Sequence, residues 1–274
     1  MLSGSQELLN TQNSTLNILF IGDIVGRSGR KVVKAAISEI KRELDIDFVI
    51  ANAENSASGF GITLNVYKEL AGSGIDAFTS GNHIYDKKEF IEEVSKFENL
   101  VRPANFPLSS PGKPYIEFEI KGIKLLIVNL IGRIFMPLSD CPFNRLDDIL
   151  QGKNDFVTIV DFHAEATSEK NAFAYYFDGK VAAILGTHTH VQTNDDRILP
   201  GGTLYITDVG MCGALDSCIG VVKENSIERF LTAVPVKFDV EKKGKMLFNA
   251  MFFKLDKNTK RVVEFKKIYK IYGE

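Results

Sequence analysis

The sequence predicts an α/β fold in a single domain. Short apolar runs alternate with segments whose apolar residues recur at helical spacing, which is the pattern of strands and helices in a parallel sheet. Near the C-terminus the pattern changes to consecutive strand-like runs, which are typical of antiparallel pairing. The 274 residues can bury one large core, and no internal repeat or linker divides them.

The first strand–helix–strand unit follows directly from the apolar pattern. Asn17 to Asp23 is an apolar run that stops at Gly-Asp, and we expect it to be a buried strand. A helix is expected from an N-cap at Ser28 to Arg42, because apolar residues recur there at three- and four-residue intervals. Asp47 to Ala51 is the next buried strand. This order implies a right-handed crossover and a parallel pair.

The middle of the chain continues the alternation. We expect helices at Leu64 to Ala71 and Lys87 to Phe97, with a short strand at Ala77 to Ser80 between them. Tyr115 to Ile120 and Ile123 to Leu130 are joined by Lys-Gly, which predicts a β-hairpin.

In the second half, a strand at Phe156 to Asp161 precedes a helix at Ser168 to Phe177. Strands are expected at Val181 to Leu185 and Thr203 to Thr207, and a glycine-rich turn follows at Asp208 to Gly213.

Three alternating runs close the chain: Val236 to Val240, Lys245 to Lys254 and Val262 to Ile271. We expect them to be antiparallel strands. At the other end, residues 1–16 are polar and lack the regions of a signal peptide, so we expect a disordered extension before a domain over residues 17–274.

Composition and charge exclude several classes of protein. The net charge of −2 gives no basic field that would recruit nucleic acid. No apolar run approaches the roughly 20 residues of a membrane helix, so no membrane contact is expected. The three cysteines form no Cys-x-x-Cys unit, which favours a reducing cytoplasm over a disulfide framework. Apolar segments at 135–143 and in the C-terminal strands leave a homo-oligomer open.

Polar side chains stand where successive strands end. The residues that follow the predicted strands are Asp23, Glu54, Asn82, His163 and His188. In open α/β sheets, ligands bind at the carboxyl ends of the strands, so these side chains can converge. All four histidines of the chain lie in such short polar motifs.

These residue types favour a binuclear metal site. Imidazole is the commonest metal ligand, and His188 and His190 are spaced to hold neighbouring cations. A single histidine is more often an ordinary core or surface residue, and an Asp or Glu after a strand can simply belong to a turn or cap a helix. The joint pattern, with every histidine in such a motif, indicates a metal-centred hydrolase.

The chain resembles the calcineurin-like metallophosphoesterases in a series of motifs: Gly22-Asp23, Glu54, Gly81-Asn82-His83, His163 and Gly186-x-His188-x-His190. It departs from the usual series at Val25, where a histidine is typical, and at Glu54-Asn55, where aspartate is typical. These two departures, together with the stretches Gly22 to Arg27 and Ala53 to Ile62, resemble the sequence pattern of the bacterial YmdB-like branch. That branch includes 2′,3′-cyclic-nucleotide phosphodiesterases. The resemblance implies layered sheets flanked by helices, an αββα-like arrangement.

The resemblance also implies two divalent metal ions. The first ion would be held by Asp23, Glu54, Asn55 and His190. The second would be held by Glu54, Asn82, His163 and His188, so that Glu54 bridges both. Mixed nitrogen and oxygen ligands suit Fe or Mn, with Zn as an alternative.

The implied activity is hydrolysis of small phosphodiesters such as 2′,3′-cyclic nucleotides by a metal-bridging hydroxide. His83 would contact the phosphate or protonate the leaving oxygen, unless it only orients a ligand. Arg27 and Ser56 are weaker candidates for substrate contacts. One alternative is a metal-bound regulatory protein that binds a nucleotide or protein partner without catalysis. An amidohydrolase barrel ranks lower, because its His-x-His pair typically lies on the first strand.

Overall fold

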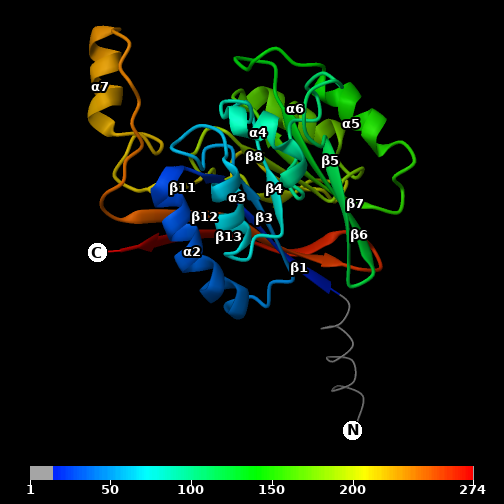
Figure 1. Ribbon diagram of the computed structural model, residues 1–274. Helices are drawn as coiled ribbons and strands as arrows, with labels where there is room; N and C mark the ends of the chain where they lie inside the picture. The colour runs from blue at the N-terminus through cyan, green and yellow to red at the C-terminus, as the bar shows by residue number, and fades with distance from the viewer. Residues whose placement is uncertain (1–14, 274) are drawn as a thin grey trace.

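The computed structural model describes residues 15–273, in which two sheets pack face to face (Figure 1). The strands of the first sheet are β1 (Thr15–Ile21), β2 (Asp23–Ile24), β3 (Phe48–Asn52), β4 (Ala77–Thr79), β11 (Met211–Ala214), β12 (Met246–Asp256) and β13 (Val262–Tyr272). Their order is β2-β11-β12-β1-β3-β4, and β13 pairs with β12.

The second sheet has the order β5-β6-β7-β8-β10-β9. Its strands are β5 (Tyr115–Ile120), β6 (Ile123–Ile131), β7 (Val157–His163), β8 (Ala183–Thr187), β9 (Arg197–Ile198) and β10 (Leu204–Ile206). The helices are α2 (Gly26–Glu43), α3 (Leu64–Ala71), α4 (Lys88–Glu92), α5 (Pro142–Leu150), α6 (Thr167–Tyr176) and α7 (Lys223–Thr232), with a 3₁₀ turn at Val94–Lys96.

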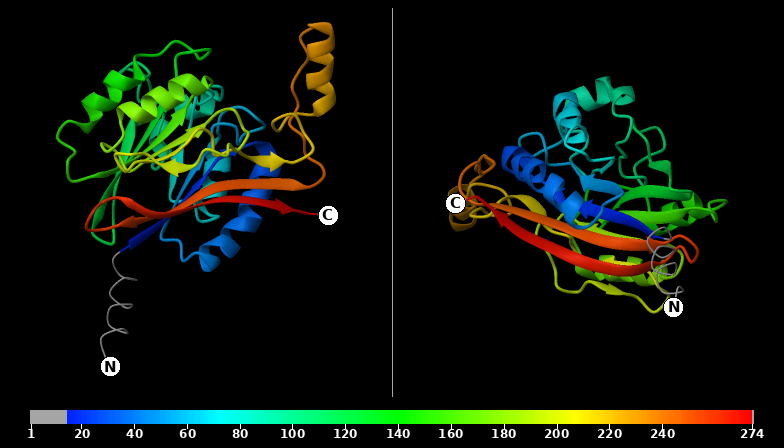
Figure 2. Two further views of the ribbon diagram at one scale, coloured as in Figure 1. Left: turned by 180° about the vertical axis from the view of Figure 1, so that it is seen from behind. Right: turned by 90° about the horizontal axis from the view of Figure 1, so that it is seen from below.

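Side-chain alternation along the strands builds the layers. In β1, Ile18 and Phe20 pack in the core between the two sheets, whereas Leu19 and Ile21 pack in the cluster that includes α2 and α3. The outer face of the second sheet packs against α5 and α6. Helices therefore cover both outer faces (Figure 2), and the predicted αββα-like fold class is confirmed.

The parallel strands of each sheet bring their carboxyl ends to one edge. In the first sheet, β3 runs parallel to β1 and β4 runs parallel to β3. In the second, β7 runs parallel to β6 and β8 runs parallel to β7. The loops that follow these strands carry the predicted ligands.

Most predicted elements are present, and some need correction. Ser28 is not an N-cap: α2 begins at Gly26, and the buried Ser28 hydroxyl donates to the Glu241 carbonyl. The predicted helix from Lys87 to Phe97 is divided into α4 and the 3₁₀ turn. The predicted strand from Val236 to Val240 is wrong, because only Val240 forms a bridge, with Val221.

The predicted domain boundary also moves. Thr15 and Leu16 were expected in the extension, but they belong to β1 and pair with Asp256 and Leu255. The rest of the predicted disordered extension, residues 1–14, lies outside the described residues.

The segment from residue 222 to 240, here called the α7 arm, stands out from the body of the molecule (Figures 1 and 2). It consists of α7 and the chain that returns to β12. Within residues 15–273, no helix combines the length and apolar character needed to cross a bilayer.

Candidate metal centre

The predicted ligands converge at the carboxyl edge that the two sheets share. Asp23 is the first residue of β2 and is separated from the end of β1 by Gly22, and Glu54 follows β3. His163 is the last residue of β7, and His188 follows β8. The first two residues come from one sheet and the last two from the other, so the centre forms only when the sheets pack together.

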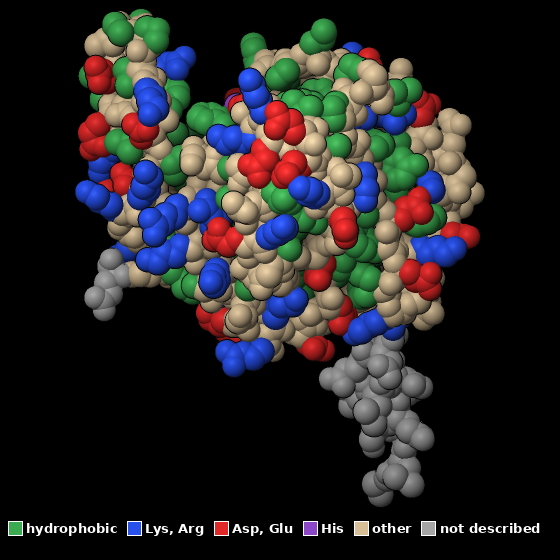
Figure 3. All heavy atoms as spheres, viewed as in Figure 1, with side chains coloured by type: hydrophobic (Ala, Val, Ile, Leu, Met, Phe, Trp, Pro, Cys, Tyr) green, Lys and Arg blue, Asp and Glu red, His purple; other side chains and the backbone are tan. Residues whose placement is uncertain are grey.

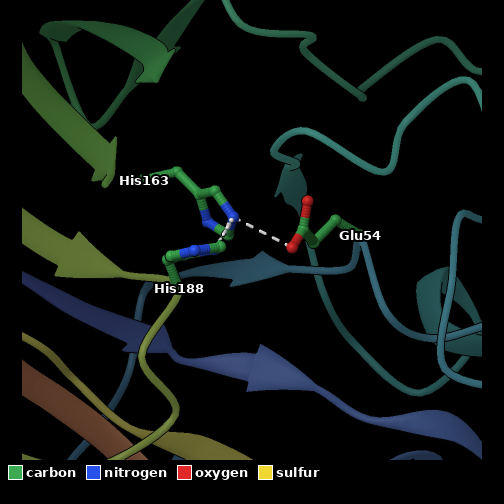
Figure 4. Close-up of side chains that lie close together, drawn as sticks. All are labelled: Glu54, His163 and His188. Carbon is green, nitrogen blue, oxygen red and sulfur yellow. Dashed lines mark hydrogen bonds and ion pairs between the residues drawn. The ribbon is translucent and has the colours of Figure 1, made fainter. Parts of the chain in front are cut away.

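In one half of the centre, the other side chains gather around His163 (Figure 4). Its Nε2 atom lies 2.9 Å from Glu54 Oε1, 3.2 Å from Asn82 Oδ1 and 3.0 Å from His188 Nδ1. Ligand atoms of Glu54, His163 and His188 all lie within 4.8 Å of one another, a spacing at which one ion could contact all three.

Asp23, Asn55 and His190 form the other half. His190 Nε2 lies 3.1 Å from Asn55 Nδ2 and 3.8 Å from Asp23 Oδ1. Asp23 Oδ1 is also 3.8 Å from His163 Nδ1, and Asn55 Nδ2 donates to Glu54 Oε1 at 3.2 Å. Glu54 therefore touches both halves, which is the position that a bridging ligand would need.

The chemistry of this donor set fits a cation. Asp23 is fully buried, and its Oδ1 atom has no hydrogen-bond partner. Such an orphaned carboxylate oxygen costs free energy unless a positive charge meets it. Burial raises the pKa of Glu54, but the imidazoles of His163 and His83 outweigh burial and lower the pKa to about 2. Glu54 is therefore an anion at neutral pH.

The same demand for positive charge acts on His163. Burial lowers the pKa of this imidazole, but the Glu54 and Asp23 carboxylates outweigh burial and raise the pKa to about 9. Burial and the neighbouring His163 lower the pKa of His188 to about 3, so His188 is neutral, as a metal ligand must be. The centre attracts one positive charge even without a metal.

A buried relay fixes which His163 nitrogen faces the centre. The Thr187 hydroxyl donates to Asp161 Oδ1 at 2.6 Å, so its oxygen accepts from His163 Nδ1 at 2.8 Å. Nδ1 therefore keeps its proton when the ring is neutral, and Nε2 is then the atom that can bind a cation in place of its own proton. Sequence analysis missed Asp161 as a functional residue, although it lies two positions before His163 in the same strand.

Gly81 gives the ligands room to meet. A Cβ atom at this position would lie 2.2 Å from Glu54 Oε2 and 2.4 Å from His163 Nε2. The glycine of the Gly-Asn-His motif is thus required by close approach, and not by a left-handed backbone.

The loop with both late histidines is strained and tightly held. His188 and His190 have φ angles of 97° and 66°, which L-residues rarely adopt. The buried Asp208 carboxylate accepts from Thr189 N at 3.0 Å and from Thr189 Oγ1 at 2.8 Å. Lys170 neutralises Asp208 through a 3.0 Å ion pair. Neither Lys170 nor Asp208 was identified from sequence, because they pair only across the fold.

His83 lies beside the centre without joining the ligand cluster. Its backbone N–H donates to Glu54 Oε2 at 3.1 Å, and its Nδ1 lies 2.8 Å from Asp86 Oδ2. The imidazole lines a cavity of about 660 Å³ that also contacts Glu54, His188 and His190. Sequence analysis missed Asp86; an acid three residues after the histidine was the available signal.

The weaker substrate candidates do not reach this cavity. Ser56 is fully buried, and its hydroxyl donates to the Ala53 carbonyl at 2.7 Å. Arg27 is exposed on the first turn of α2 and is absent from the cavity lining. Direct substrate contacts for these two side chains stay a prediction, and neither side chain lines this cavity.

Comparisons with known proteins cover nearly the whole chain. The model of the family described as YmdB-like protein matches residues 19–268. A 2′,3′-cyclic-nucleotide 2′-phosphodiesterase from Bacillus subtilis is 46% identical over 255 residues, which cover 92% of this chain and 96% of the relative.

Two solved structures share the fold. A novel phosphatase from Mycoplasma pneumoniae matches with a TM-score of 0.90 and 39% identity, over 94% of each chain. A hypothetical protein from Thermus thermophilus matches with a TM-score of 0.88 and 41% identity, over 94% of this chain and 100% of that one. With the family match and these relatives, the resemblance seen in the motifs is confirmed, and the chain belongs to the YmdB-like protein family.

Proposed function

We propose that this protein is a metal-dependent phosphodiesterase that hydrolyses small phosphodiesters, with 2′,3′-cyclic nucleotides as its substrate class. The observation that carries the proposal is the convergence of carboxylate, amide and imidazole groups on Glu54 at the floor of a cavity. The 46% identity to a relative named for that activity supports the substrate class.

The ligand sets that we propose divide at Glu54. Asp23, Asn55 and His190 would hold one ion, and Asn82, His163 and His188 would hold the other. Glu54 would contact both. Fe or Mn suits these nitrogen and oxygen ligands, with Zn as an alternative. Two such ions supply Lewis acidity that neutralises the phosphate oxygens and acidifies water.

His83 is the residue that we propose to move a proton. Asp86 accepts from its Nδ1–H, which leaves Nε2 as the nitrogen free to face the substrate. As water adds to phosphorus and loses one proton to the solvent, the bond from phosphorus to O2′ would break and His83 would give its Nε2–H to O2′. The solvent would then return a proton to His83. The product is a nucleoside 3′-monophosphate.

The test combines metal analysis with turnover of 2′,3′-cyclic AMP. We expect roughly two ions per chain after purification with Mn²⁺ or Fe²⁺. His83→Ala should keep the ions and lose about 10²- to 10⁴-fold in kcat. Tyr85→Phe is the matched control on the same loop, because it removes only a hydroxyl that donates to the Pro111 carbonyl.

Other outcomes would contradict the proposal. Bound metal without turnover of any phosphodiester would favour the regulatory, non-catalytic protein. Loss of metal in His83→Ala, in proportion to the loss of activity, would show that His83 supports a ligand and does not transfer a proton.

We also propose a cytoplasmic location. The three cysteines, Cys141, Cys212 and Cys218, are free thiols, which supports a reducing compartment.

A further inference from the structure

The cavity above the metal centre has two unlike sides. Its floor carries Glu54, His188 and His190, and part of its wall comes from the α7 arm, including Arg229, Phe230 and Phe238. Figure 3 shows the arm standing apart from the body with a hollow between them. The arm therefore contributes to the site although it is far from the ligands in the sequence.

The arm offers aromatic rings to this cavity. The Phe230 side chain is 87% exposed, and Phe238 is half-buried. From the body, Phe60 adds a third ring, whose centroid lies 4.9 Å from that of His83. Exposed aromatic faces beside a polar catalytic floor are suited to a ligand with one charged end and one flat apolar end.

The arm also supplies the one Lys or Arg side chain of the cavity lining, Arg229. Its guanidinium carbon lies 4.9 Å from the centre of the Phe238 ring, and within the described residues its guanidinium has no carboxylate partner. A guanidinium stacked on a ring keeps its N–H edges available. Because Glu54 and Glu165 also line the cavity, Arg229 is the protein side chain whose fixed positive charge can help to attract an anion into it.

We propose that the α7 arm is the nucleoside-recognition element of the site. Phe230 and Phe238 stack against the base of a nucleoside 2′,3′-cyclic phosphate, and Arg229 draws in its anionic phosphodiester. The inference rests on the proposed function and deepens it. A volume of about 660 Å³ is in the range of pockets for ligands of this size, whereas a cyclic phosphate without a base would leave the aromatic wall uncovered.

The experiment compares two substrates with the same five-membered cyclic diester. One is 2′,3′-cyclic AMP, and the other is glycerol 1,2-cyclic phosphate, which has no base. The variants are Phe230→Leu and Phe238→Leu, which stay apolar but lose the ring. Leu231→Ala is the control, because Leu231 is 80% exposed on the same helix and does not line the cavity.

We expect each ring substitution to lower kcat/KM for 2′,3′-cyclic AMP roughly tenfold, mainly through KM, as the loss of base stacking predicts. Turnover of glycerol 1,2-cyclic phosphate should change by less than about twofold, because that substrate gives the rings nothing to stack on. Arg229→Gln should lower kcat/KM for both substrates, less so at high salt. Leu231→Ala should change neither. Equal losses for both substrates in the ring variants, or no loss, would overturn the inference.

Binding measurements separate this inference from the proposed function. Calorimetry with adenosine 3′-monophosphate should show binding to the metal-loaded wild type and weaker binding to Phe230→Leu. If the wild type hydrolyses neither substrate but this difference remains, the arm recognises nucleosides and the proposed activity is wrong. If the wild type hydrolyses both substrates and the variant binds the nucleotide equally well, the inference is wrong and the activity stands.

Discussion

Replacing Gly81 by alanine should dismantle the metal centre while leaving the fold in place. The added methyl carbon would lie 2.2 Å from Glu54 Oε2 and 2.4 Å from His163 Nε2. Contacts of real Cβ atoms are essentially never shorter than 3.0 Å, so the carboxylate must retreat by about 0.8 Å and the imidazole by about 0.6 Å. Gly81 itself does not need a positive φ angle, so backbone strain adds nothing.

The size of the effect follows from these displacements. Glu54 touches both halves of the centre, so its movement weakens both proposed ion sites at once. A misplacement of about 1 Å at a reacting centre costs roughly 10²-fold in rate. We therefore expect Gly81→Ala to lose most of its bound metal and at least about 100-fold in kcat/KM for 2′,3′-cyclic AMP.

The assay is metal content per chain, kcat/KM, and thermal unfolding followed by circular dichroism. Gly213→Ala is the matched control, because the nearest atom to its added Cβ would be Met211 Sδ at 3.5 Å, an ordinary contact. The reasoning is refuted if Gly81→Ala binds metal and turns over substrate as the wild type does. It is also refuted if Gly213→Ala loses metal to the same extent.

Three further substitutions test the groups around the centre. Thr187→Val removes the hydroxyl between His163 and Asp161, so metal affinity should fall about 10- to 100-fold in a metal titration. The free energy of unfolding of the metal-free protein, measured in urea, should fall by about 1–3 kcal/mol. Lys170→Met leaves the buried Asp208 charge without its partner, and the free energy of unfolding should fall by about 3–5 kcal/mol in the same assay; an unchanged midpoint would show that Asp208 is satisfied by its remaining donors. Asp86→Asn should lower kcat less than His83→Ala does and leave metal content unchanged, because the ring keeps its place and loses only an anionic acceptor; a loss of metal would assign Asp86 to the ligand scaffold.

The α7 arm shows where local sequence patterns fail. Val236 to Val240 alternate like a strand, but within residues 15–273 only Val240 forms a bridge, with Val221, and a strand needs a partner for its backbone groups. Ser28 is a good N-cap residue type, yet α2 begins earlier because its first turn packs under the chain that returns from the arm, where the Ser28 hydroxyl reaches the Glu241 carbonyl. The lack of a pairing strand decided the first case, and a contact with a distant segment decided the second.

The sequence by itself determined the α/β class, most strands, and which side chains stand at their carboxyl ends. These features are local: an apolar run predicts a buried strand, and the residue after it must lie at the edge of the sheet. Only the tertiary structure decided what those residues meet. Asp161 holds His163 through Thr187, and Asp86 accepts from His83. Asp208, paired with Lys170, accepts from Thr189. The roles of these partners could not be assigned from the sequence. A carboxylate gains such a role from burial and from a partner's position in space. Asp161 lies in the same strand as His163, but the Thr187 hydroxyl that joins them comes from β8, and Lys170 reaches Asp208 from α6.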